Sequence, residues 1–566
     1  MIGCHKGLAK NVTMPVTPAP PCPFTRRHWG VLALVLALYF TLGCFKLGFS
    51  DVGIDEGRFG ICALNILDDI HQLATVSEDP AGPVGTKPPL FPLSVAASFA
   101  LLGKTEFALR FVNVVFLAAS GLLLCACVQL LFQDSVLSLW SAVLFLFNPG
   151  TLTYARIAMP EPLVMLGGCL AVVAALKART GPWLPWGSLC GLALGCAFLS
   201  KLWLVFPFVI AAGWIWLCAG PRSWRRALAF AVVGLSCFLL TASSHYLLIR
   251  LWTPADTEAW KDIYYLFSLR SRVAGANYDP AMWFRPWWFY SGVAFKASFF
   301  ALPFVFSGAV LLLKHREWLA TGVIVALLSP VLLLSFFQVK QATYVFPAIP
   351  ALMLLAALGF RKSLAGWTSD FPYSLFAAGA ISLFFLARDV TRPAEAAVIV
   401  VLYALLGVSV LLARNNRRIA LVAVSAMLIA CVGTADFVVV RKSLYRTYYR
   451  EIADLFKDDL RPVPVRQLAF IAPEFAAMEF YTYRTGQYWA TYYMQTSVSS
   501  LEEHLERRDI VFYLVDRNQQ MYGGKITPLQ LEMLRQSTTD KSVEFERRLG
   551  HKLDVAVLVP RRQDKE

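Results

Sequence analysis

Charged residues are scarce in this 566-residue sequence: Lys, Arg, Asp and Glu make up 16% of it, whereas 57% is hydrophobic. A soluble domain of this size needs a far larger polar share, so the sequence predicts that lipid solvates most of the chain. The formal net charge is +15, but the basic residues lie at the ends of apolar runs rather than in one patch. This distribution is typical of membrane topology and argues against a nucleic-acid partner.

Sequence features of several other protein classes are missing. There is no P-loop, no dinucleotide-binding glycine motif and no internal repeat. Most of the 12 cysteines lie in apolar runs, where a thiol behaves as a small hydrophobic group, so we expect no disulfide framework. The spacing of Cys and His residues in this sequence does not match that of a metal site. The polar, Pro-rich start lacks the pattern of a cleavable signal, so the first apolar run is interpreted as a signal anchor.

Long apolar runs recur along the chain. A helix needs roughly 20 apolar residues to cross a bilayer, so we expect about 13 transmembrane helices, several of them short. The predicted spans are Trp29–Leu47, Phe107–Phe132, Ser135–Leu152, Pro162–Leu176, Trp186–Ser200, Leu202–Gly220, Ala227–Leu248, Tyr290–Leu313, Trp318–Phe337, Tyr344–Phe360, Pro372–Leu386, Ala396–Leu412 and Ile419–Val440.

Basic residues flank alternate connections, from Arg26 and Arg27 to Arg417 and Arg418. Because positive charge is retained on the cytoplasmic side, this pattern predicts an inner N-terminus and an outer C-terminus. We therefore expect three parts. They are a cytoplasmic tail (1–28), a membrane module (29–440) with external loops at 48–106 and 249–289, and an extracytoplasmic domain (441–566).

The first external loop is predicted to contain two juxtamembrane helices. Apolar residues between Phe59 and Leu73 share one helical face, with Asp68 and His71 opposite, which is typical of a helix lying on the membrane. Leu90–Leu102 is apolar but too short to span comfortably.

The C-terminal region alternates strand-like and helical patterns, which favours a small α/β domain. The expected strands are Val465–Ile471, Ile510–Val515 and Asp554–Val559, and the expected helices are Glu474–Tyr483 and Pro528–Arg535. The predicted fold class is thus an all-α polytopic membrane protein with a small α/β extracytoplasmic domain.

Several charged residues lie at the outer ends of predicted spans, where a charge at membrane depth is costly and function is the default hypothesis. Each one alone could instead be an interfacial anchor or half of a surface ion pair. The adjacent acids Asp55 and Glu56 favour a functional role more strongly, because paired carboxylates repel. Taken alone, Arg270 in the second external loop is better explained as part of a solvated basic loop. The others are Glu161, Lys87, Arg156, Lys201 and Lys340.

Outer carboxylates facing outer cations fit transfer of a sugar from a lipid phosphate. The leaving phosphate is a weak base that needs cations rather than a general acid, and Lys and Arg provide that stabilisation. The acceptor hydroxyl is a poor nucleophile that needs a base, which a carboxylate provides. One base and a cationic pocket suffice for a single displacement with inversion, unlike glycoside hydrolysis.

The order of these motifs resembles bacterial lipid A aminoarabinose transferases and related protein O-mannosyltransferase-like enzymes, which belong to the GT-C glycosyltransferase superfamily. The matching segments are Asp55-Glu56-Gly57-Arg58-Phe59, Lys87-Pro88-Pro89-Leu90, Phe107-Ala108-Leu109-Arg110-Phe111, Ala155-Arg156, Glu161-Pro162-Leu163, Ser200-Lys201, Lys340 and Tyr344–Leu352.

The resemblance implies specific roles for these residues. Asp55 would be the catalytic base and Glu161 a second catalytic acid near the reacting centre. The resemblance also implies that Lys87, together with Lys201 and Lys340, binds the carrier phosphate. We further predict that substrate contacts Glu56, Arg58, Arg156, Arg270 and Tyr344. The donor would be an undecaprenyl-phosphate-linked sugar. The acceptor would be a hydroxyl or phosphate of lipid A, another polysaccharide or a protein, on the periplasmic side of a bacterial inner membrane.

Two positions depart from the aminoarabinose transferases. Many of them have Glu directly before the Lys-Pro pair, where this chain has Thr86, and their second acid is commonly Asp rather than Glu161. Both changes concern the identity of sugar and acceptor. No cofactor is required by the motifs, and a divalent cation stays open because some relatives use one.

Two other function classes compete with the glycosyltransferase. A transporter or flippase of lipid-linked sugar precursors would also need outward-facing charges, but it does not require a large outer domain and often has repeat symmetry. A non-catalytic scaffold leaves the outer acids and cations without a purpose.

Overall fold

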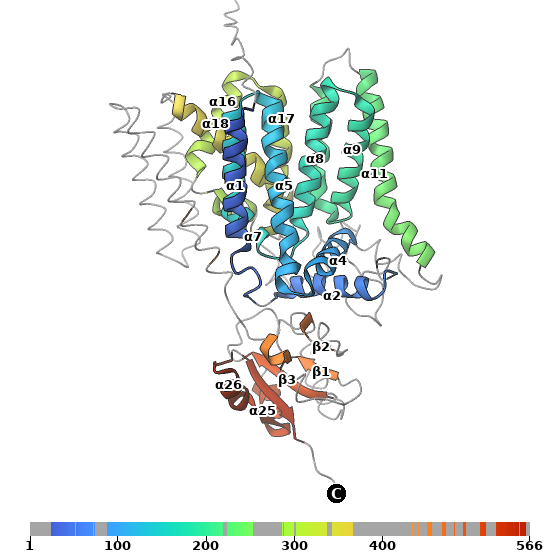
Figure 1. The fold of residues 1–566 in the computed structure, drawn as a ribbon, viewed down its shortest axis with the longest axis vertical. Coiled ribbons are helices and arrows are strands. Elements are labelled where there is room, and N and C mark those ends of the chain that lie inside the picture. Colours follow the sequence, from blue (N-terminus) through green and yellow to red (C-terminus); the bar gives the residue numbers. More distant parts are fainter. Residues whose placement is uncertain are drawn as a thin grey trace, which may run out of the picture.

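The computed structural model shows a helical bundle with a small mixed α/β domain at one end (Figure 1). It describes residues 24–50, 52–71, 73, 88–218, 224–252, 286, 288–298, 301–336, 342–365, 433, 440, 450–454, 467–470, 480–481, 491–493, 510–516, 528–553 and 555–561.

The described bundle is built from long apolar helices that run roughly side by side. Within the described ranges, 6 helical segments are long and apolar enough to cross a membrane, or up to 7 if one bent pair is a single span. They include α1 (Arg26–Cys44), α5 (Glu106–Phe132), α8 (Glu161–Thr180), α11 (Trp224–Trp252), α17 (Trp318–Leu333) with the turn that follows it, and α18 (Ile349–Ala365) with the 3-10 turn before it, η5 (Ala342–Ala348). The chain is therefore a multi-pass membrane protein.

Several predicted spans are shorter or broken in the structure. Ser135–Leu152 is two helices, α6 (Ser135–Leu146) and α7 (Pro149–Ala155), which are bent by 59°. The bend follows from Asn148, whose side chain caps the new helix and whose successor, Pro149, cannot donate to the preceding turn.

Tyr290–Leu313 likewise consists of α15 (Phe289–Ser298) and α16 (Leu302–His315). The predicted spans at 186–200 and 202–220 are the shorter helices α9 (Trp183–Phe198) and α10 (Phe206–Leu217). The last three predicted spans, at 372–386, 396–412 and 419–440, lie outside the described residues apart from two isolated positions, so the total of about 13 stays a prediction.

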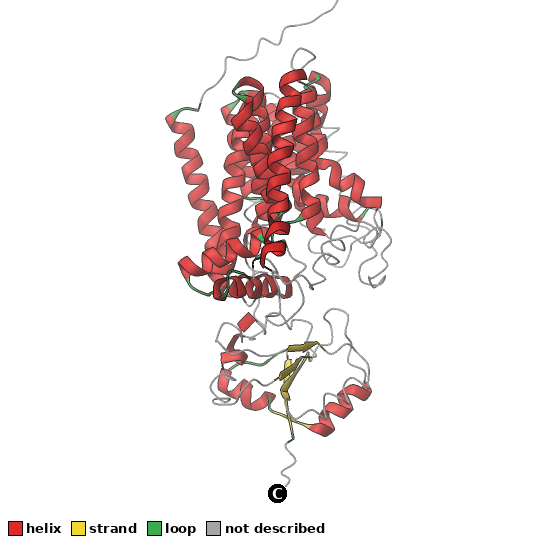
Figure 2. Ribbon diagram, turned by 90° about the vertical axis from the view of Figure 1, so that its right-hand side faces the viewer, coloured by secondary structure: helices red, strands yellow, loops and turns green. Residues whose placement is uncertain are grey.

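Two helices lie across one end of the bundle, between it and the C-terminal domain (Figures 1 and 2). They are α2 (Ile54–Asp68) and α4 (Leu90–Leu102), which correspond to the two predicted juxtamembrane helices. The amphipathic segment ends as a helix at Asp68 rather than at Leu73. Both helices bury their apolar side chains in one cluster, in which the Phe59 and Phe91 rings meet edge to face at 5.0 Å.

The C-terminal domain contains a five-stranded sheet in the order β2-β1-β3-β5-β4. β1 is parallel to β2 and β3, whereas β5 is antiparallel to β3 and β4. The strands are β1 (Gln467–Phe470), β2 (Thr491–Tyr493), β3 (Ile510–Asp516), β4 (Thr538–Asp540) and β5 (Val555–Pro560), with helices α25 (Pro528–Ser537) and α26 (Ser542–Leu549). Three strands and one helix match the prediction. The short strands β2 and β4 were missed because three residues show no alternation of their own.

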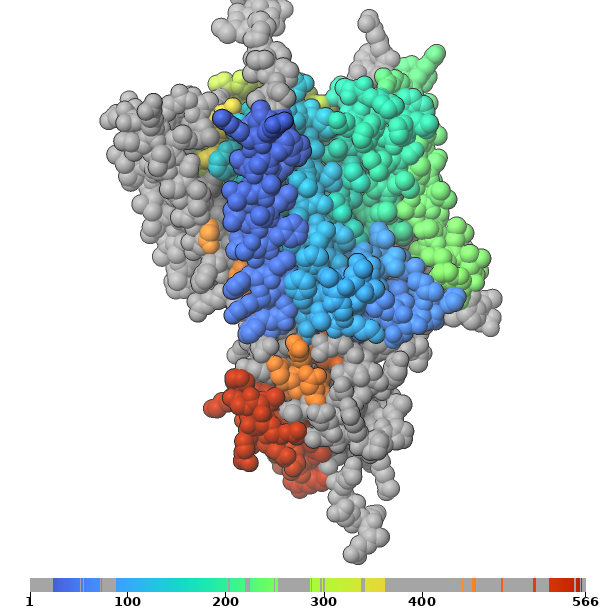
Figure 3. All heavy atoms as spheres, viewed as in Figure 1, coloured from blue at the N-terminus to red at the C-terminus, as the bar shows by residue number. Residues whose placement is uncertain are grey.

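The C-terminal domain packs directly on the α2 and α4 layer. In Figure 3 orange atoms of this domain lie next to the blue atoms of the bundle end. Phe480, Leu514 and Val557 share one buried apolar cluster with Phe59 and Phe91. The domain and the start of α2 therefore form one packed unit.

Candidate active site

The site begins where the chain leaves α1 and turns into α2. Gly53 is the N-cap of α2, and its N–H donates to Glu56 Oε2 at 2.9 Å, so the N3 carboxylate closes the first turn. Asp55 and Glu56 both lie in this first turn, where the helix dipole favours negative charge. Helix geometry therefore accounts for part of their coexistence.

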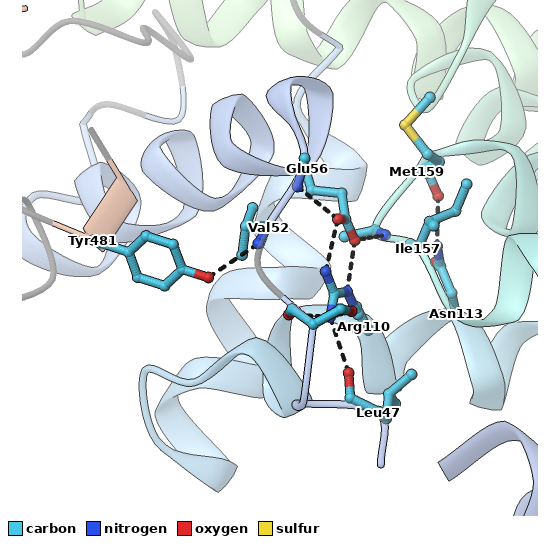
Figure 4. A network of polar contacts seen from close by, with 11 residues as sticks. Leu47, Val52, Glu56, Arg110, Asn113, Ile157, Met159 and Tyr481 are labelled. Carbon is cyan, nitrogen blue, oxygen red and sulfur yellow. Dashed lines mark hydrogen bonds and ion pairs between the residues drawn. The ribbon is translucent and has the colours of Figure 1, made fainter. Parts of the chain in front are cut away.

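Glu56 is held by four hydrogen bonds (Figure 4). The Arg110 guanidinium, from α5, donates from Nε and Nη2 to its two oxygens, both at 2.8 Å. Ala158 N donates to Glu56 Oε1 at 2.7 Å. The carboxylate thus ties α2, α5 and the loop before α8 together.

The electrostatics of Glu56 follow from this pairing. Burial works against the charged form, but the Arg110 charge and the hydrogen bonds from Arg110, Gly53 and Ala158 outweigh it and lower the pKa of Glu56. Glu56 was predicted to bind substrate. Because all its strong acceptor positions are occupied by protein donors, we assign it a positioning role instead.

Asp55 lies in a different environment from its neighbour. Its side chain is exposed and, within the described part of the chain, accepts no hydrogen bond. The two adjacent acids therefore separate into one bound within the protein and one directed to solvent. Only Asp55 of this pair has oxygens accessible to a substrate.

The loop before α8 is fixed by side chains from other elements. Asn113 of α5 donates from Nδ2 to the carbonyl oxygens of Ile157 at 2.6 Å and Met159 at 2.9 Å (Figure 4). Arg156, which was predicted to bind substrate, is buried and donates from Nη1 to the carbonyls of Leu42 and Gly43 near the end of α1. A cation at the C-terminus of a helix stabilises it, so these contacts give Arg156 a structural role.

Glu161 begins α8, directly after that loop. Its carboxylate is fully buried and accepts a hydrogen bond from Lys201 Nζ at 2.5 Å through Oε1. Glu161 Oε2 is also buried and has no hydrogen-bond donor among the described residues. Lys201 Nζ lies 5.6 Å from the centroid of the Tyr344 ring. Three predicted site residues from distant parts of the sequence therefore meet here.

The start of α4 lies beside the end of α9. Leu90 N donates to Leu199 O at 3.2 Å, two residues before Lys201. Arg58, one turn after Ile54 in α2, is half-buried. Lys87, Arg270 and Lys340 lie outside the described residues, so their roles stay predictions.

Arg110 and Asn113 were not predicted as functional residues. The available signal was the same one used for the other charges, a cation at the start of an apolar helix. Arg110 lies in the matching segment from Phe107 to Phe111, but no role was predicted for it. Over the described ranges, no three His, Cys, Asp or Glu side chains converge as a metal site requires.

The helical bundle with its juxtamembrane layer and C-terminal domain defines a polytopic membrane protein whose fold is like that of ArnT. The crystal structure of ArnT from Cupriavidus metallidurans in the apo state matches with a TM-score of 0.67 at 13% identity, over 94% of this chain and 98% of that one. A second structure of that protein, bound to undecaprenyl phosphate, matches with a TM-score of 0.66 at 14% identity, over the same shares. The oligosaccharyltransferase of Archaeoglobus fulgidus matches with a TM-score of 0.52 at 11% identity, over 86% of this chain and 69% of that one.

Sequence comparison finds similarity to the same kinds of enzymes. Residues 71–250 match the model of the dolichyl-phosphate-mannose-protein mannosyltransferase family. The undecaprenyl phosphate-alpha-4-amino-4-deoxy-L-arabinose arabinosyl transferase of Pseudomonas aeruginosa is 29% identical over 276 residues, which is 46% of this chain and 47% of the relative. The aligned region thus spans about half the length of the curated relatives. The predicted resemblance to aminoarabinose transferases and protein O-mannosyltransferase-like enzymes is confirmed.

Proposed function

We propose that the chain is a membrane glycosyltransferase that moves a sugar from an undecaprenyl-phosphate carrier to an acceptor hydroxyl or phosphate on the periplasmic side. The transfer is a single displacement with inversion at the sugar carbon. Asp55 accepts the proton of the acceptor as it attacks, and the carrier leaves as its phosphate.

One observation carries this proposal: the two adjacent acids have opposite environments. Glu56 accepts four protein hydrogen bonds, whereas Asp55 is exposed on the same helical turn. A general base must reach its substrate within hydrogen-bond distance, and the exposed Asp55 carboxylate is accessible for such a contact. The contacts of Glu56 fix helix α2, which bears Asp55. The base is therefore held in place before substrate binds.

The Glu161 and Lys201 pair supports a charged second part of the site. Lys201 is partly exposed whereas its partner is fully buried, so its ammonium group can face an anionic ligand while its own charge is balanced. Glu161 Oε2 has no donor among the described residues, and it would accept a hydrogen bond from a sugar hydroxyl or amine once substrate binding exposes it. Lys87, three residues before Leu90, is proposed as a further cation for the carrier phosphate.

The relatives point to the donor class rather than to the acceptor. One matching structure is bound to undecaprenyl phosphate, and the relative in Pseudomonas aeruginosa is named for an undecaprenyl-phosphate-linked aminoarabinose. For this chain, lipid A, another envelope polysaccharide and a protein are all acceptors to be tested.

The test uses cells that lack the gene and are complemented with wild type, Asp55→Asn or Glu56→Gln. Mass spectrometry of envelope lipids, glycans and proteins then identifies the transferred sugar as a mass difference. We expect wild type to restore that difference and Asp55→Asn to lose it, with a rate reduction of about 100-fold or more for loss of a general base.

Folding is controlled by the amount of each variant in the membrane and by its unfolding midpoint in detergent. Asp55→Asn should match wild type in both, because the exposed carboxylate makes no contact that folding needs. Full transfer by Asp55→Asn removes Asp55 as the base. Translocation of a lipid-linked sugar in liposomes without any transferred product would replace the proposal with a flippase.

A further inference from the structure

The C-terminal domain contacts α2 on either side of Asp55 in the sequence. Tyr481 Oη accepts a hydrogen bond from Val52 N at 3.0 Å, three residues before Asp55 (Figure 4). Both residues are buried, at 0% and 1% exposure. On the other side, the Phe480 ring fills the notch at Gly60, where an added Cβ would lie 2.6 Å from Cδ2 of that ring.

The Val52 N–H has no partner within the helix, because α2 begins only at Ile54. A buried N–H that loses its acceptor is costly, so the Tyr481 hydroxyl contributes to the path of the chain into the helix. Gly60 serves a different purpose, since the missing side chain lets the C-terminal domain approach the helix backbone closely. The first turn of α2 is therefore held by the C-terminal domain before and after the acidic pair.

Further contacts join the same two parts. Arg450 pairs with Glu106, the first residue of α5, at 3.5 Å. Ile452 and Ala453 are buried in the apolar cluster that contains Phe59 of α2. The same α5 supplies Arg110 to Glu56. The domain thus contacts both helices that determine where the acids lie.

We infer that Tyr481 is a positioning residue, through which the docked C-terminal domain orients the first turn of α2 and hence the Asp55 carboxylate. This inference rests on the proposed role of Asp55. The domain then acts as part of the catalytic assembly rather than as a separate module. A general base displaced by an ångström loses much of its rate advantage, so a single distant hydrogen bond can affect turnover.

The test compares full-length wild type, Tyr481→Phe, Gly60→Ala and Val543→Ala in detergent. Solubilised membranes of the gene-deletion strain are the probe, because they contain donor and acceptor, and release of undecaprenyl phosphate is measured against membrane concentration. Tyr481→Phe keeps the ring and removes the acceptor. We expect kcat to fall by roughly tenfold, with the apparent KM unchanged. The unfolding midpoint should drop slightly, because the buried Val52 N–H loses its acceptor.

Two further variants serve as a second test and as a control. Gly60→Ala forces Phe480 to move, so kcat should fall in the same direction. Val543→Ala lies on α26, where the native side chain is 63% exposed, and should retain full turnover. Equal kcat in wild type and Tyr481→Phe would overturn the inference. So would a loss of kcat that is fully explained by a smaller folded fraction at the assay temperature, since that pattern indicates a purely structural residue.

A second measurement does not depend on activity. Amide hydrogen exchange of the peptide from Val52 to Phe59 should be faster in Tyr481→Phe than in wild type, while a peptide from α8 keeps its rate. Absence of transfer by wild type would overturn the proposed function, and hydrogen exchange would still report on the contact. Unchanged exchange at Val52–Phe59 would overturn the positioning role itself.

Discussion

Asp55 and Glu56 are consecutive carboxylates on one helical turn, yet they face different surroundings. A helix rotates successive side chains by about 100°, so adjacent residues point to different faces. Glu56 points to Arg110 and Ala158, and Asp55 points to solvent. One backbone turn therefore provides both the proposed reacting group and the anchor that holds it.

The Glu56 pairing predicts a pH dependence of stability. The folded pKa of Glu56 lies below its ordinary value of about 4.3, so the unfolded state binds the proton more tightly. The stabilisation is complete above that ordinary value and is lost as pH falls through the folded pKa. We expect the unfolding midpoint in detergent to drop as pH falls below about 4.3, with a shallower drop in Glu56→Gln.

At neutral pH, Glu56→Gln should be destabilised by about 3 kcal/mol, because it leaves the buried Arg110 charge without its partner. If the unfolding midpoint of Glu56→Gln fell as steeply with pH as that of wild type, the pH dependence would belong to other groups. Asp55→Asn is the matched control. Because the native Asp55 carboxylate is exposed, this variant should show the same pH dependence of the unfolding midpoint as wild type.

Helix packing in the bundle depends on close backbone approach at glycines. Gly359 of α18 faces α16, and an added Cβ would lie 2.0 Å from the Phe304 carbonyl oxygen. Gly308 of α16 faces α18 in the same way, with the Leu355 carbonyl oxygen 2.0 Å from its added Cβ. Small residues at such crossings let helices in lipid gain van der Waals contact.

Gly359→Ala should therefore force α16 and α18 apart and destabilise the protein by about 1–3 kcal/mol. The measurement is the unfolding midpoint of the purified protein in detergent. Gly213→Ala in α10 is the matched control, because nothing lies within 4 Å of the added Cβ, and it should be neutral or slightly stabilising. Equal effects of the two substitutions would contradict the packing explanation.

At the scale of the whole molecule, the acids and the C-terminal domain occupy one end of the bundle, whereas α1 begins at the other (Figure 1). Together with the flanking basic residues, this arrangement predicts that Asp55 and the C-terminus share the outer side of the membrane. Alkaline phosphatase fused after residue 566 should be active outside, and a fluorescent protein fused before residue 1 should fold inside.

One result of the two fusions would contradict this topology. If both reporters reported the same side, the bundle would cross the membrane an even number of times and the outer placement of the site would fail. A reporter inserted between α8 and α9, near Lys177 and Arg179, should match the N-terminal one, because these basic residues are expected inside.

The sequence predicted the helical elements well where their apolar runs are long. α1, α5, α8, α11 and α4 lie at or within a few residues of the predicted positions. Breaks were missed where one local residue decides, such as Asn148 and Pro149 between α6 and α7. Hydropathy is averaged over a window of about 20 residues, so one capping residue barely changes it and the break is not detected.

Apolar composition, flanking charge and motif order were enough to determine the membrane class, the juxtamembrane helices and the GT-C resemblance, because each is written locally in the chain. The partners of the charged residues were decided only by the tertiary structure. Glu56 meets Arg110 across 54 positions and Val52 meets Tyr481 across 429. No local pattern encodes such pairings, since they arise when packed helices bring distant buried polar groups close enough to satisfy one another.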